Sequence, residues 1–337
     1  MRIVLFEAED WEKAACATLM RQHDVRCTKV PLNIATVDEF KDAEVISPFV
    51  VSRLDVSIFD RLPELKLIAT RSAGYDHIDL TACRERGFAI ANVPDYGDAT
   101  VAEHAFALLL ALARDIVESV ALTRRGGFLM AGMRGLELRD KVIAVVGTGR
   151  IGRRTIEIAR GFGMRVIAYD QVQDAAAATR LGFTYGPLDE VLAQADVVTL
   201  HVPSSPSTVG LIGERQFTAM KDRAILINTA RGNVVDTEAL VRALASGKLR
   251  AAGLDVLPQE PLIREEAEIF RQDRAVDTSD LKALVANHVL LRFPNVLVTP
   301  HNAYNTDAAL ARIMETTVTN IESFAAGRPV NLVQMAA

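Results

Sequence analysis

The stretch VVGTGRIGRR, residues 145–154, decides the fold class of this 337-residue chain. Its glycines, Gly147, Gly149 and Gly152, have the spacing G-x-G-x-x-G, which ordinary turns can also show. Here the motif follows an apolar, β-rich run at 142–146 and precedes a predicted helix. In that context the first glycine permits a tight turn, the second lets a pyrophosphate approach the backbone, and the third lets helix pack on strand. The stretch therefore predicts a dinucleotide-binding βαβ unit rather than only a turn.

The next predicted strand, RVIAYD, supports the same interpretation because it ends on Asp170, 18 residues past Gly152. A carboxylate at this place accepts hydrogen bonds from the adenine ribose hydroxyls and repels a 2′-phosphate, which favours NAD over NADP. The two residues that follow add no guanidinium to offset this repulsion. Arg150 is expected beside the pyrophosphate. Arg153 and Arg154 are expected on an exposed helix face, although a guanidinium nearby could also reach a phosphate.

The composition is that of a soluble globular protein, with 50% hydrophobic and 24% charged residues. The 38 basic and 43 acidic residues include no basic run, so no nucleic-acid partner is predicted. Cys16, Cys27 and Cys83 lack a C-x-x-C spacing and are expected to be free thiols, with no disulfide or metal site. The N-terminus does not form a signal peptide, and the longest apolar stretch, 105–113, is shorter than the roughly 20 residues of a membrane span. We therefore expect a cytoplasmic protein without membrane association.

Two successive α/β patterns run along the chain, and they predict an α/β fold of two Rossmann-like or flavodoxin-like, doubly wound parallel-sheet domains. In the first hundred residues, β-rich runs alternate with amphipathic segments, of which the first begins at Asp10. The first set of predicted strands is RIVLF, AEVISPF, LKLIATRS and FAIANVP. The second set is VIAVVG, RVIAYD, DVVTLHVP, AILINTA, AAGLDV and VLVTPH.

Two long helices are predicted outside these patterns. The segment from 98 to 125 predicts one helix over 101–122, with a capping box formed by Thr100 and Glu103. This helix is apolar over too much of its circumference for one packed face, so it is expected to pack between domains or between subunits. A final helix over 307–326 is predicted to end at Gly327, with Pro329 just beyond.

Three polar residues follow predicted strands at the carboxyl edge of the second sheet, where open α/β folds bind ligands. His301 follows VLVTP, but a single histidine in such a place is more often structural than catalytic. Arg231 follows AILINTA and is placed to grip a carboxylate with its planar fork. Glu260, beyond AAGLDV, would alone be a solvated loop residue, but the three together predict a reaction site. His201 is expected at the cofactor. The remaining histidines are expected to be exposed, as His23, or structural, as His77, His104 and His288.

Over almost its whole length, the chain resembles the D-isomer-specific 2-hydroxyacid dehydrogenases. The motifs RSAGYDHIDL, NVPDYGDATVAEHA, VVGTGRIGR, TLHVP, INTARG, GLDV…EP and TPH occur in the family's order. The resemblance implies reversible, NADH-dependent reduction of a 2-oxo acid to a D-2-hydroxy acid. It also implies a substrate-binding domain, residues 1–99 plus 304–337, with an NAD-binding Rossmann domain, residues 100–303, inserted in it and a cleft between the two.

The resemblance further implies the roles of individual residues. Arg231 and the backbone of Ala73 and Gly74 hold the substrate carboxylate, and Arg231 polarises the carbonyl group. His301 donates the proton, and Glu260 pairs with its imidazole and favours the charged form. A homodimer is implied through the helix at 101–122. The cofactor contacts implied, by motif or by resemblance, are Gly147, Gly149, Arg150, Ile151, Gly152, Asp170, His201, Val202, Pro203, Thr229, Ala230 and Asp255.

Two departures from the family pattern bear on the substrate. The segment between Glu260 and His301, with an insertion at 262–295, is longer than in the phosphoglycerate-type members and resembles the D-lactate dehydrogenase branch. Phe49, Tyr96 and Tyr304 would form an apolar pocket with little to bind a phosphate. A small or medium 2-oxo acid without phosphate is therefore expected.

The same motifs also fit other functions. A glyoxylate or hydroxypyruvate reductase, or a phosphoglycerate-type dehydrogenase, would share most of these motifs, although the aromatic pocket disfavours the last. An NAD-sensing corepressor keeps the fold and the three catalytic residues, but the long flanking tails expected of one are not seen. A methyltransferase would leave Arg231, Glu260 and His301 without a role.

Overall fold

The structure is a computed structural model that describes residues 1–128, 132–258 and 278–334. The chain forms two compact units, one of Met1–Tyr96 with Thr306–Ala337 and one of Gly97–Asn305. Each unit has one sheet, and every paired strand in both sheets is parallel. The prediction of two parallel-sheet α/β domains is confirmed.

The first unit has a five-stranded sheet in the order β2-β1-β3-β4-β5, which is the flavodoxin-like order. Buried apolar clusters cover both faces of the sheet, as parallel strands require. Sequence reasoning missed the edge strand β2, whose side chains are only half-buried or exposed. The strands are β1 (Arg2–Leu5), β2 (Asp24–Cys27), β3 (Val45–Ser47), β4 (Leu67–Ala69) and β5 (Ala89–Ala91). The helices are α1 (Asp10–Ala15), α2 (Ala17–Gln22), η1 (Val37–Phe40), α3 (Val56–Phe59), α4 (Leu80–Arg86) and α14 (Asp307–Ala325).

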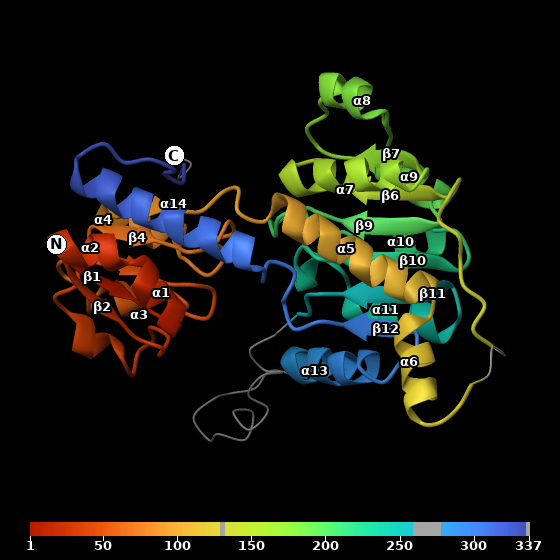
Figure 1. Ribbon diagram of the computed structural model, residues 1–337, viewed down its shortest axis with the longest axis horizontal. Coiled ribbons are helices and arrows are strands. Elements are labelled where there is room, and N and C mark those ends of the chain that lie inside the picture. Colours follow the sequence, from red (N-terminus) through yellow and green to blue (C-terminus); the bar gives the residue numbers. More distant parts are fainter. Residues whose placement is uncertain (129–131, 259–277, 335–337) are drawn as a thin grey trace. The chain divides into compact units, whose positions relative to one another are not determined.

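The last helix, α14, returns the C-terminal part of the chain to the first unit, where it packs on β4 and α1 (Figure 1). The hydroxyl of Thr306 caps its N-terminus by accepting a hydrogen bond from the Ala309 amide at 3.3 Å. The helix ends at Ala325, and Gly327 follows with a φ of +71°, a conformation that glycine adopts without strain. The predicted helix over 307–326 is thus confirmed.

The second unit has a seven-stranded sheet in the order β12-β11-β10-β9-β6-β7-β8. The chain winds outward from β6 in one direction to β8 and in the other from β9 to β12, so the order reverses between β6 and β9. Such a reversal is where doubly wound folds bind nucleotides. The strands are β6 (Val142–Val146), β7 (Arg165–Tyr169), β8 (Thr184–Tyr185), β9 (Val197–Leu200), β10 (Ala224–Asn228), β11 (Leu249–Leu254) and β12 (Val296–Val298). The helical elements are α5 (Asp98–Ala113), α6 (Ile116–Arg124), α7 (Arg150–Gly161), α8 (Ala175–Leu181), α9 (Leu188–Gln194), α10 (Glu214–Ala219), η2 (Gly232–Val234), α11 (Thr237–Ala245) and α13 (Thr278–Leu290).

The prediction of one helix over 101–122 is wrong, because the structure has two helices, α5 and α6. The carbonyl oxygen of Ala113 accepts a hydrogen bond of 2.7 Å from the Leu136 amide, and Asp115 has a φ of +48°. Both features end α5 before the second helix begins. The predicted capping box is wrong too, since Gly97 is the N-cap and Thr100 lies buried inside the first turn.

The two helices differ in how they are packed. Within the second unit, α5 packs against α7 and across the seven-stranded sheet (Figure 1). Leu109 and Leu112 of α5 belong to the buried core of this unit. Gly253 of β11 allows this close approach, because an added Cβ would lie 3.0 Å from the Leu108 Cβ. Contacts within the second unit therefore account for the apolar residues around α5. By contrast, α6 has no buried residue.

The inserted segment at 262–295 is described only from residue 278 onward. There it forms α13, which packs on α11. Leu290 is buried in the core, and the Asn287 side chain donates a 2.8 Å hydrogen bond to the Pro258 carbonyl. Glu260 lies outside the described residues.

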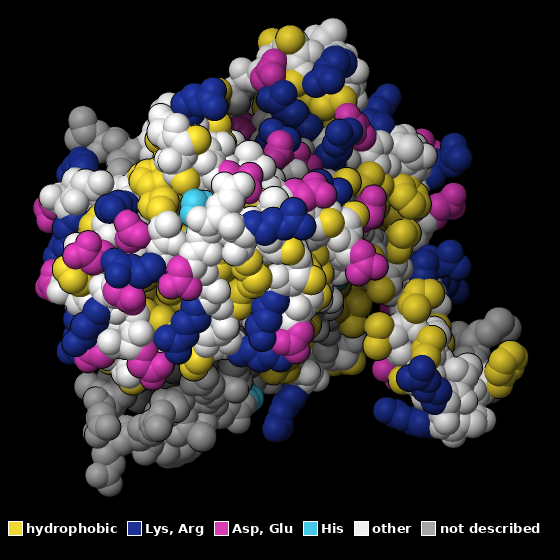
Figure 2. All heavy atoms as spheres, turned by 60° about the vertical axis from the view of Figure 1, so that its left-hand side comes forward, with side chains coloured by type: hydrophobic (Ala, Val, Ile, Leu, Met, Phe, Trp, Pro, Cys, Tyr) yellow, Lys and Arg dark blue, Asp and Glu magenta, His cyan; other side chains and the backbone are white. Residues whose placement is uncertain are grey.

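The surface shown in Figure 2 carries Lys and Arg side chains interspersed with Asp and Glu. Within the described residues, every helix is too short or too polar to cross a bilayer.

Candidate functional site

The glycine-rich turn joins β6 to α7 at the point where strand order reverses. Gly147 has a φ of +96°, and an added Cβ would lie 2.6 Å from the His201 carbonyl oxygen. A Cβ at Gly152 would lie 2.0 Å from the Gly147 oxygen, so helix and turn can approach only with glycine there. Gly149, the N-cap of α7, differs because a Cβ would meet no atom within 4 Å. The backbone at Gly149 therefore borders open space at a helix N-terminus, the arrangement that binds a pyrophosphate.

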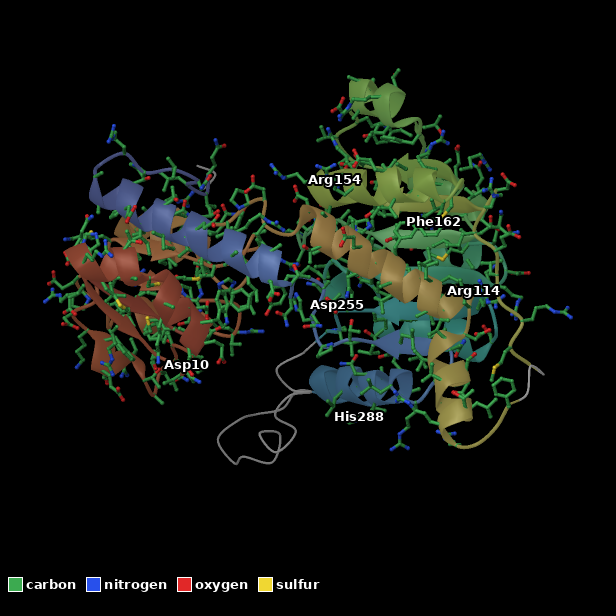
Figure 3. The ribbon with its side chains drawn as sticks, in the orientation of Figure 1. Asp10, Arg114, Arg154, Phe162, Asp255 and His288 are labelled. Atoms are coloured by element: carbon green, nitrogen blue, oxygen red, sulfur yellow. The ribbon has the colours of Figure 1, made fainter. Side chains whose placement is uncertain are left out.

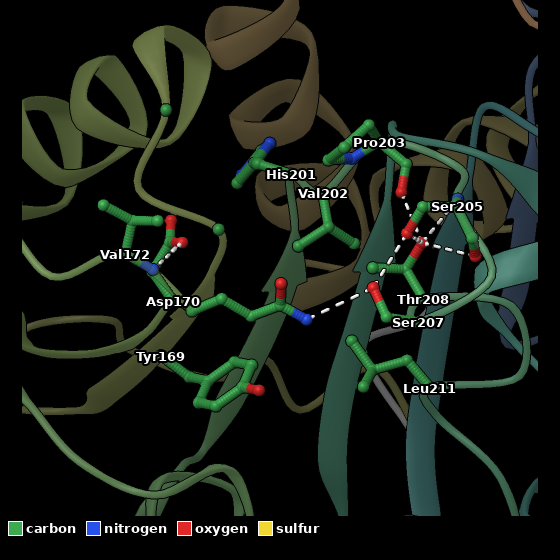
Figure 4. A pocket seen from close by; sticks show the side chains of 13 residues that line it. Tyr169, Asp170, Val172, His201, Val202, Pro203, Ser205, Ser207, Thr208 and Leu211 are labelled. Atoms are coloured by element: carbon green, nitrogen blue, oxygen red, sulfur yellow. Dashed lines mark hydrogen bonds between the residues drawn. The ribbon is translucent and has the colours of Figure 1, made fainter. Parts of the chain in front are cut away.

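A pocket of about 240 Å³ opens beside this turn, between the end of β7 and the loop after β9 (Figure 4). Six of the residues predicted to contact the cofactor line it: Gly147, Gly149, Asp170, His201, Val202 and Pro203. Seven residues that sequence reasoning missed complete the lining: Tyr169, Gln171, Val172, Ser205, Ser207, Thr208 and Leu211. Six other predicted contacts do not line it: Arg150, Ile151, Gly152, Thr229, Ala230 and Asp255. The pocket combines apolar walls with a carboxylate at its rim.

Asp170 fixes the rim of the pocket to the glycine-rich turn. Its Oδ2 accepts hydrogen bonds from the Thr148 amide at 2.6 Å and the Thr148 hydroxyl at 3.0 Å. Its Oδ1 accepts from the Val172 amide at 3.0 Å. A carboxylate has about four acceptor positions, so these bonds leave room for a ribose hydroxyl to donate. The carboxylate is therefore both oriented by the protein and able to bind a further donor.

The three arginines near the turn are held by acidic partners. Arg150 pairs with Asp98 at 2.7 Å, and Arg154 pairs with Glu157 at 2.7 Å. Arg153 pairs with Asp174 at 3.0 Å, and its Nε also donates to the Thr148 carbonyl at 2.8 Å. Among the described residues, none of these arginines forms an ion pair with Asp170. This charge arrangement favours a free 2′-hydroxyl over a 2′-phosphate at the rim.

His201 contributes a neutral ring to the pocket. Its Nε2 lies 2.9 Å from the Thr199 hydroxyl. Burial lowers the pKa of His201 to about 3, because the charged imidazolium would lose hydration there. The ring is therefore uncharged at neutral pH.

The loop after β9 is built from short polar side chains. The Thr208 hydroxyl donates to the Pro203 carbonyl at 2.6 Å and accepts from the Ser205 amide at 2.8 Å. Nε2 of Gln171 donates a hydrogen bond to the Ser207 hydroxyl at 3.2 Å. The sequence signal for this wall was the cluster SSPST at 204–208, shortly after a buried strand.

A second group of site residues lies where β10, β11 and β12 end side by side. Asn228, the last residue of β10, accepts from the Ala230 amide at 3.0 Å and donates to the Arg231 carbonyl at 2.9 Å. Its side chain thereby shapes the turn that carries Arg231. The Thr229 hydroxyl is buried and has no hydrogen-bond partner among the described residues. Gly232 lets this turn approach the loop after β11, since an added Cβ would lie 2.2 Å from the Leu257 carbonyl carbon.

Asp255, which lies just beyond β11 (Figure 3), organises the loop that carries His301. Its carboxylate accepts from the amides of Asn302 at 2.8 Å and Ala303 at 2.9 Å, and from the Thr299 hydroxyl at 2.5 Å. Burial would raise the pKa of Asp255, but the hydrogen bonds it accepts hold that pKa below its usual value. His301 itself has a φ of +52° in this loop. A buried, ionised Asp255 thus holds His301 in a backbone conformation that a non-glycine residue rarely adopts.

His104 of α5 joins this network, although its sequence setting indicated only a structural role. Its Nε2 lies 3.0 Å from the Thr299 hydroxyl and 3.4 Å from Asp255 Oδ1. Because Thr299 donates its hydroxyl proton to Asp255, the ring nitrogen of His104 is the donor to Thr299. The signal that could have identified His104 is its polar place on an otherwise apolar helix.

The remaining predicted residues divide between the units. Tyr304 belongs to the second unit with Arg231 and His301, whereas Phe49, Ala73, Gly74 and Tyr96 belong to the first. In the first unit, Asn92 Nδ2 donates to the Ala73 carbonyl at 2.8 Å, and the Ser72 hydroxyl donates to the Gly74 carbonyl at 2.6 Å. The Tyr96 carbonyl accepts two hydrogen bonds from Arg312.

Among the described residues there is no cluster of acidic, histidine and cysteine side chains that could hold a metal ion. The three cysteines are free; Cys16 and Cys83 are buried, and Cys27 is half-buried.

Comparison with known proteins gives consistent similarities. Residues 106–303 match the description "D-isomer specific 2-hydroxyacid dehydrogenase, NAD binding domain". A glyoxylate reductase of Pyrococcus furiosus is 34% identical over 329 residues, which cover 96% of this chain and 87% of the relative. A D-specific alpha-keto acid dehydrogenase of Enterococcus faecalis is 42% identical over 264 residues, covering 77% and 76%. The crystal structure of an Aquifex aeolicus D-lactate dehydrogenase, complexed with NAD and lactic acid, matches with a TM-score of 0.88 and 35% identity over 97% of this chain and 96% of that one.

Proposed function

Since the chain belongs to the D-isomer specific 2-hydroxyacid dehydrogenase family, we propose that it reduces small or medium 2-oxo acids without phosphate to D-2-hydroxy acids. It is an NAD-dependent oxidoreductase that acts on 2-hydroxy acids. The observation that carries the proposal is the arrangement of the second sheet's carboxyl edge. There a dinucleotide pocket lies at the order reversal, and at the ends of the strands beyond it the Arg231 turn and the His301 loop lie on either side of Asp255.

The residues at this edge fit NAD. The open space at Gly149 accommodates a pyrophosphate, and Asp170 offers its carboxylate to ribose hydroxyls. The buried Thr229 hydroxyl, without a described partner, is a polar atom that a ligand can satisfy. When bound as NADH, the cofactor supplies the hydride for reduction of the carbonyl group.

The chain's own residues bind the substrate and move its proton. The Arg231 guanidinium and the amides of Ala73 and Gly74 hold the carboxylate, and Arg231 also polarises the carbonyl group. His301 gives its proton to the developing alkoxide in reduction and removes it in oxidation. Glu260, which lies outside the described residues, is the partner that the family resemblance implies for this imidazole. Support for these roles comes from the strand-end setting of Arg231 and from the Asp255 hydrogen bonds that hold the His301 loop.

The substrate class rests on the aromatic residues Phe49, Tyr96 and Tyr304, which offer no cation to a phosphate. Similarity to the Pyrococcus furiosus glyoxylate reductase favours glyoxylate as a second candidate, and similarity to the Enterococcus faecalis alpha-keto acid dehydrogenase favours larger 2-oxo acids. We further propose that the first unit, expected from the sequence as residues 1–99 and 304–337, is the substrate-binding domain, and that the second unit, expected as residues 100–303, is the NAD-binding domain.

We propose a cytoplasmic homodimer in which α6, rather than α5, supplies the apolar contact. The structure leaves Ile116, Val117 and Val120 of α6 between 42% and 52% exposed, and Phe128 beyond it is 93% exposed. Neighbouring exposed apolar side chains of this kind mark association surfaces. Light scattering of the wild type and of Val117→Glu would test the proposal, since the variant should shift from dimer to monomer. A monomeric wild type contradicts it.

The test of the function follows the loss of NADH absorbance with pyruvate, glyoxylate, hydroxypyruvate, phenylpyruvate and branched 2-oxo acids. Chiral chromatography of the product then assigns the isomer. The proposal expects turnover of at least one unphosphorylated 2-oxo acid to its D-hydroxy acid. NADH binding without turnover of any of them would instead favour an NAD-sensing binding protein.

A further inference from the structure

The loop after β3, which carries Phe49, is fixed by a single carboxylate. Oε2 of Glu7 accepts hydrogen bonds from the amides of Val50 at 3.1 Å and Val51 at 3.0 Å. Oε1 accepts from the Ser52 amide at 2.9 Å and from the Ser52 hydroxyl. Three successive backbone amides and one hydroxyl therefore converge on one side chain. Both side-chain oxygens of Glu7 must accept hydrogen bonds to satisfy these four donors.

Glu7 is itself held in an unusual conformation. It follows β1 with a φ of +56°, which is uncommon for a residue with a side chain. Ser52, on the other side of the contact, is fully buried, and its hydroxyl accepts from the Leu32 amide at 2.8 Å. A non-glycine residue keeps such a backbone only where surrounding contacts determine it. Here those contacts are the ones that fix the Phe49 loop.

A buried arginine anchors the other end of the loop. The Arg71 amide donates to the Pro48 carbonyl at 3.0 Å, and Nη1 of Arg71 donates to the Ser47 carbonyl at 2.6 Å. Nη2 donates to the Phe6 carbonyl at 2.5 Å. The guanidinium carbon also lies 5.8 Å from the centre of the Phe49 ring, within reach of a cation–π attraction. Phe49 is thus bracketed by Pro48, bound to Arg71, and Val50, bound to Glu7.

The same arginine begins the turn proposed to hold the substrate carboxylate. Arg71 is 1% exposed, and its charge is balanced by Glu12, whose Oε1 lies 3.0 Å from Nε. Ser72 follows, and its carbonyl accepts from the Val93 amide at 3.0 Å. The turn at 72–74 and the Phe49 loop therefore share one rigid, buried anchor. Their separation is fixed within the first unit.

We propose that Glu7 is a positioning residue that sets which 2-oxo acid side chains are accepted, by holding Phe49 at a fixed place relative to the carboxylate-binding turn at 72–74. This inference rests on the proposed function, because it takes Phe49 and that turn as substrate contacts. Glu7 touches no reacting atom and acts only through the loop. Its loss should change side-chain discrimination and leave the proton and hydride steps as they are.

Glu7→Gln is the sharpest variant, because either amide orientation turns an NH₂ group toward backbone N–H donors. Glyoxylate and phenylpyruvate are the matched probes, since the first has no side chain on its carbonyl carbon and the second has a large one. The ratio of kcat/KM for the two should shift by at least ~10-fold, which corresponds to about 1.4 kcal/mol. The shift should come through the KM of phenylpyruvate, with kcat/KM for glyoxylate and the NADH Kd unchanged. Glu64→Gln, the same change at an exposed position, should leave the ratio as it is.

A double-mutant cycle with Phe49→Ala shows whether Glu7 acts through Phe49, since the two changes should then not be additive in the ratio. If Glu7→Gln does not fold, Glu7→Asp provides the same test, because it keeps the charge but has a shorter side chain that does not reach the same amides. Equal losses for both substrates, or a ratio matching that of Glu64→Gln, would overturn the inference. A wild type that reduces no 2-oxo acid would instead remove the proposed function.

Discussion

The backbone amide of His301 donates a 2.8 Å hydrogen bond to the carbonyl oxygen of Asp255, and the Asp255 carboxylate accepts from the next two amides of the same loop. One buried residue at the end of β11 therefore sets the course of the chain on both sides of the proposed proton donor. His301 is placed by this backbone network, and Thr299 and His104 extend it to α5.

Asp255→Asn should lower kcat at saturating NADH by at least ~10-fold. An amide cannot accept at all the positions where the carboxylate accepts, and a hydrogen bond to a charged group contributes about 1.5–3 kcal/mol. Steady-state kinetics with the best 2-oxo acid measures the effect. Asp222→Asn, whose side chain is 86% exposed, is the control. Equal kcat values in the two variants would show that the Asp255 network does not position His301.

Asp170→Ala should narrow the preference for NADH over NADPH. The change removes an acceptor for ribose hydroxyls and relieves repulsion of a 2′-phosphate. It also frees Thr148, so the NADH Kd should rise. The measurement is the ratio of kcat/KM values for the two cofactors, with Asp222→Ala as control. An unchanged ratio would remove Asp170 from the ribose site.

Folding stability should depend on pH through His201. The pKa of His201 is lowered in the folded state to about 3, from an ordinary value of 6.5, so the unfolded chain binds the proton more readily. Its contribution is present above pH 6.5 and is lost as pH falls through 6.5 toward 3, by at most about 2 kcal/mol at pH 5. Urea unfolding at pH 7.5 and pH 5 should show a smaller loss in His201→Gln than in wild type. Equal losses would mean that His201 is hydrated and titrates normally.

Much of the fold could be predicted because periodicity and glycine chemistry are local. Gly152 needs to be a glycine because an added Cβ would meet Gly147, only a few residues earlier, and Asp170 directly follows β7, the strand that pairs with β6. The broken helix shows the limit of this reasoning. α5 ends because Leu136, distant in sequence, takes the Ala113 carbonyl, and no local pattern records that bond.

The same limit explains the site residues that were missed. His104 and Thr299 are 195 residues apart, and Glu7 meets Ser52 across 45 residues. Their roles depend on hydrogen bonds that only the folded chain brings together. Asn228 was easier to identify from the sequence, because a buried polar residue at the end of an apolar strand indicates a side chain that hydrogen-bonds to the backbone.

The most direct test of the central claim compares NADH oxidation by wild type and His301→Ala with the same unphosphorylated 2-oxo acid, at saturating NADH. General acid–base catalysis contributes about 10²- to 10⁴-fold, so turnover should fall by that factor while the NADH Kd stays the same. Arg215→Ala, an exposed change in the same unit, should keep the wild-type rate. A His301→Ala enzyme that reduces the 2-oxo acid at the wild-type rate would contradict the account.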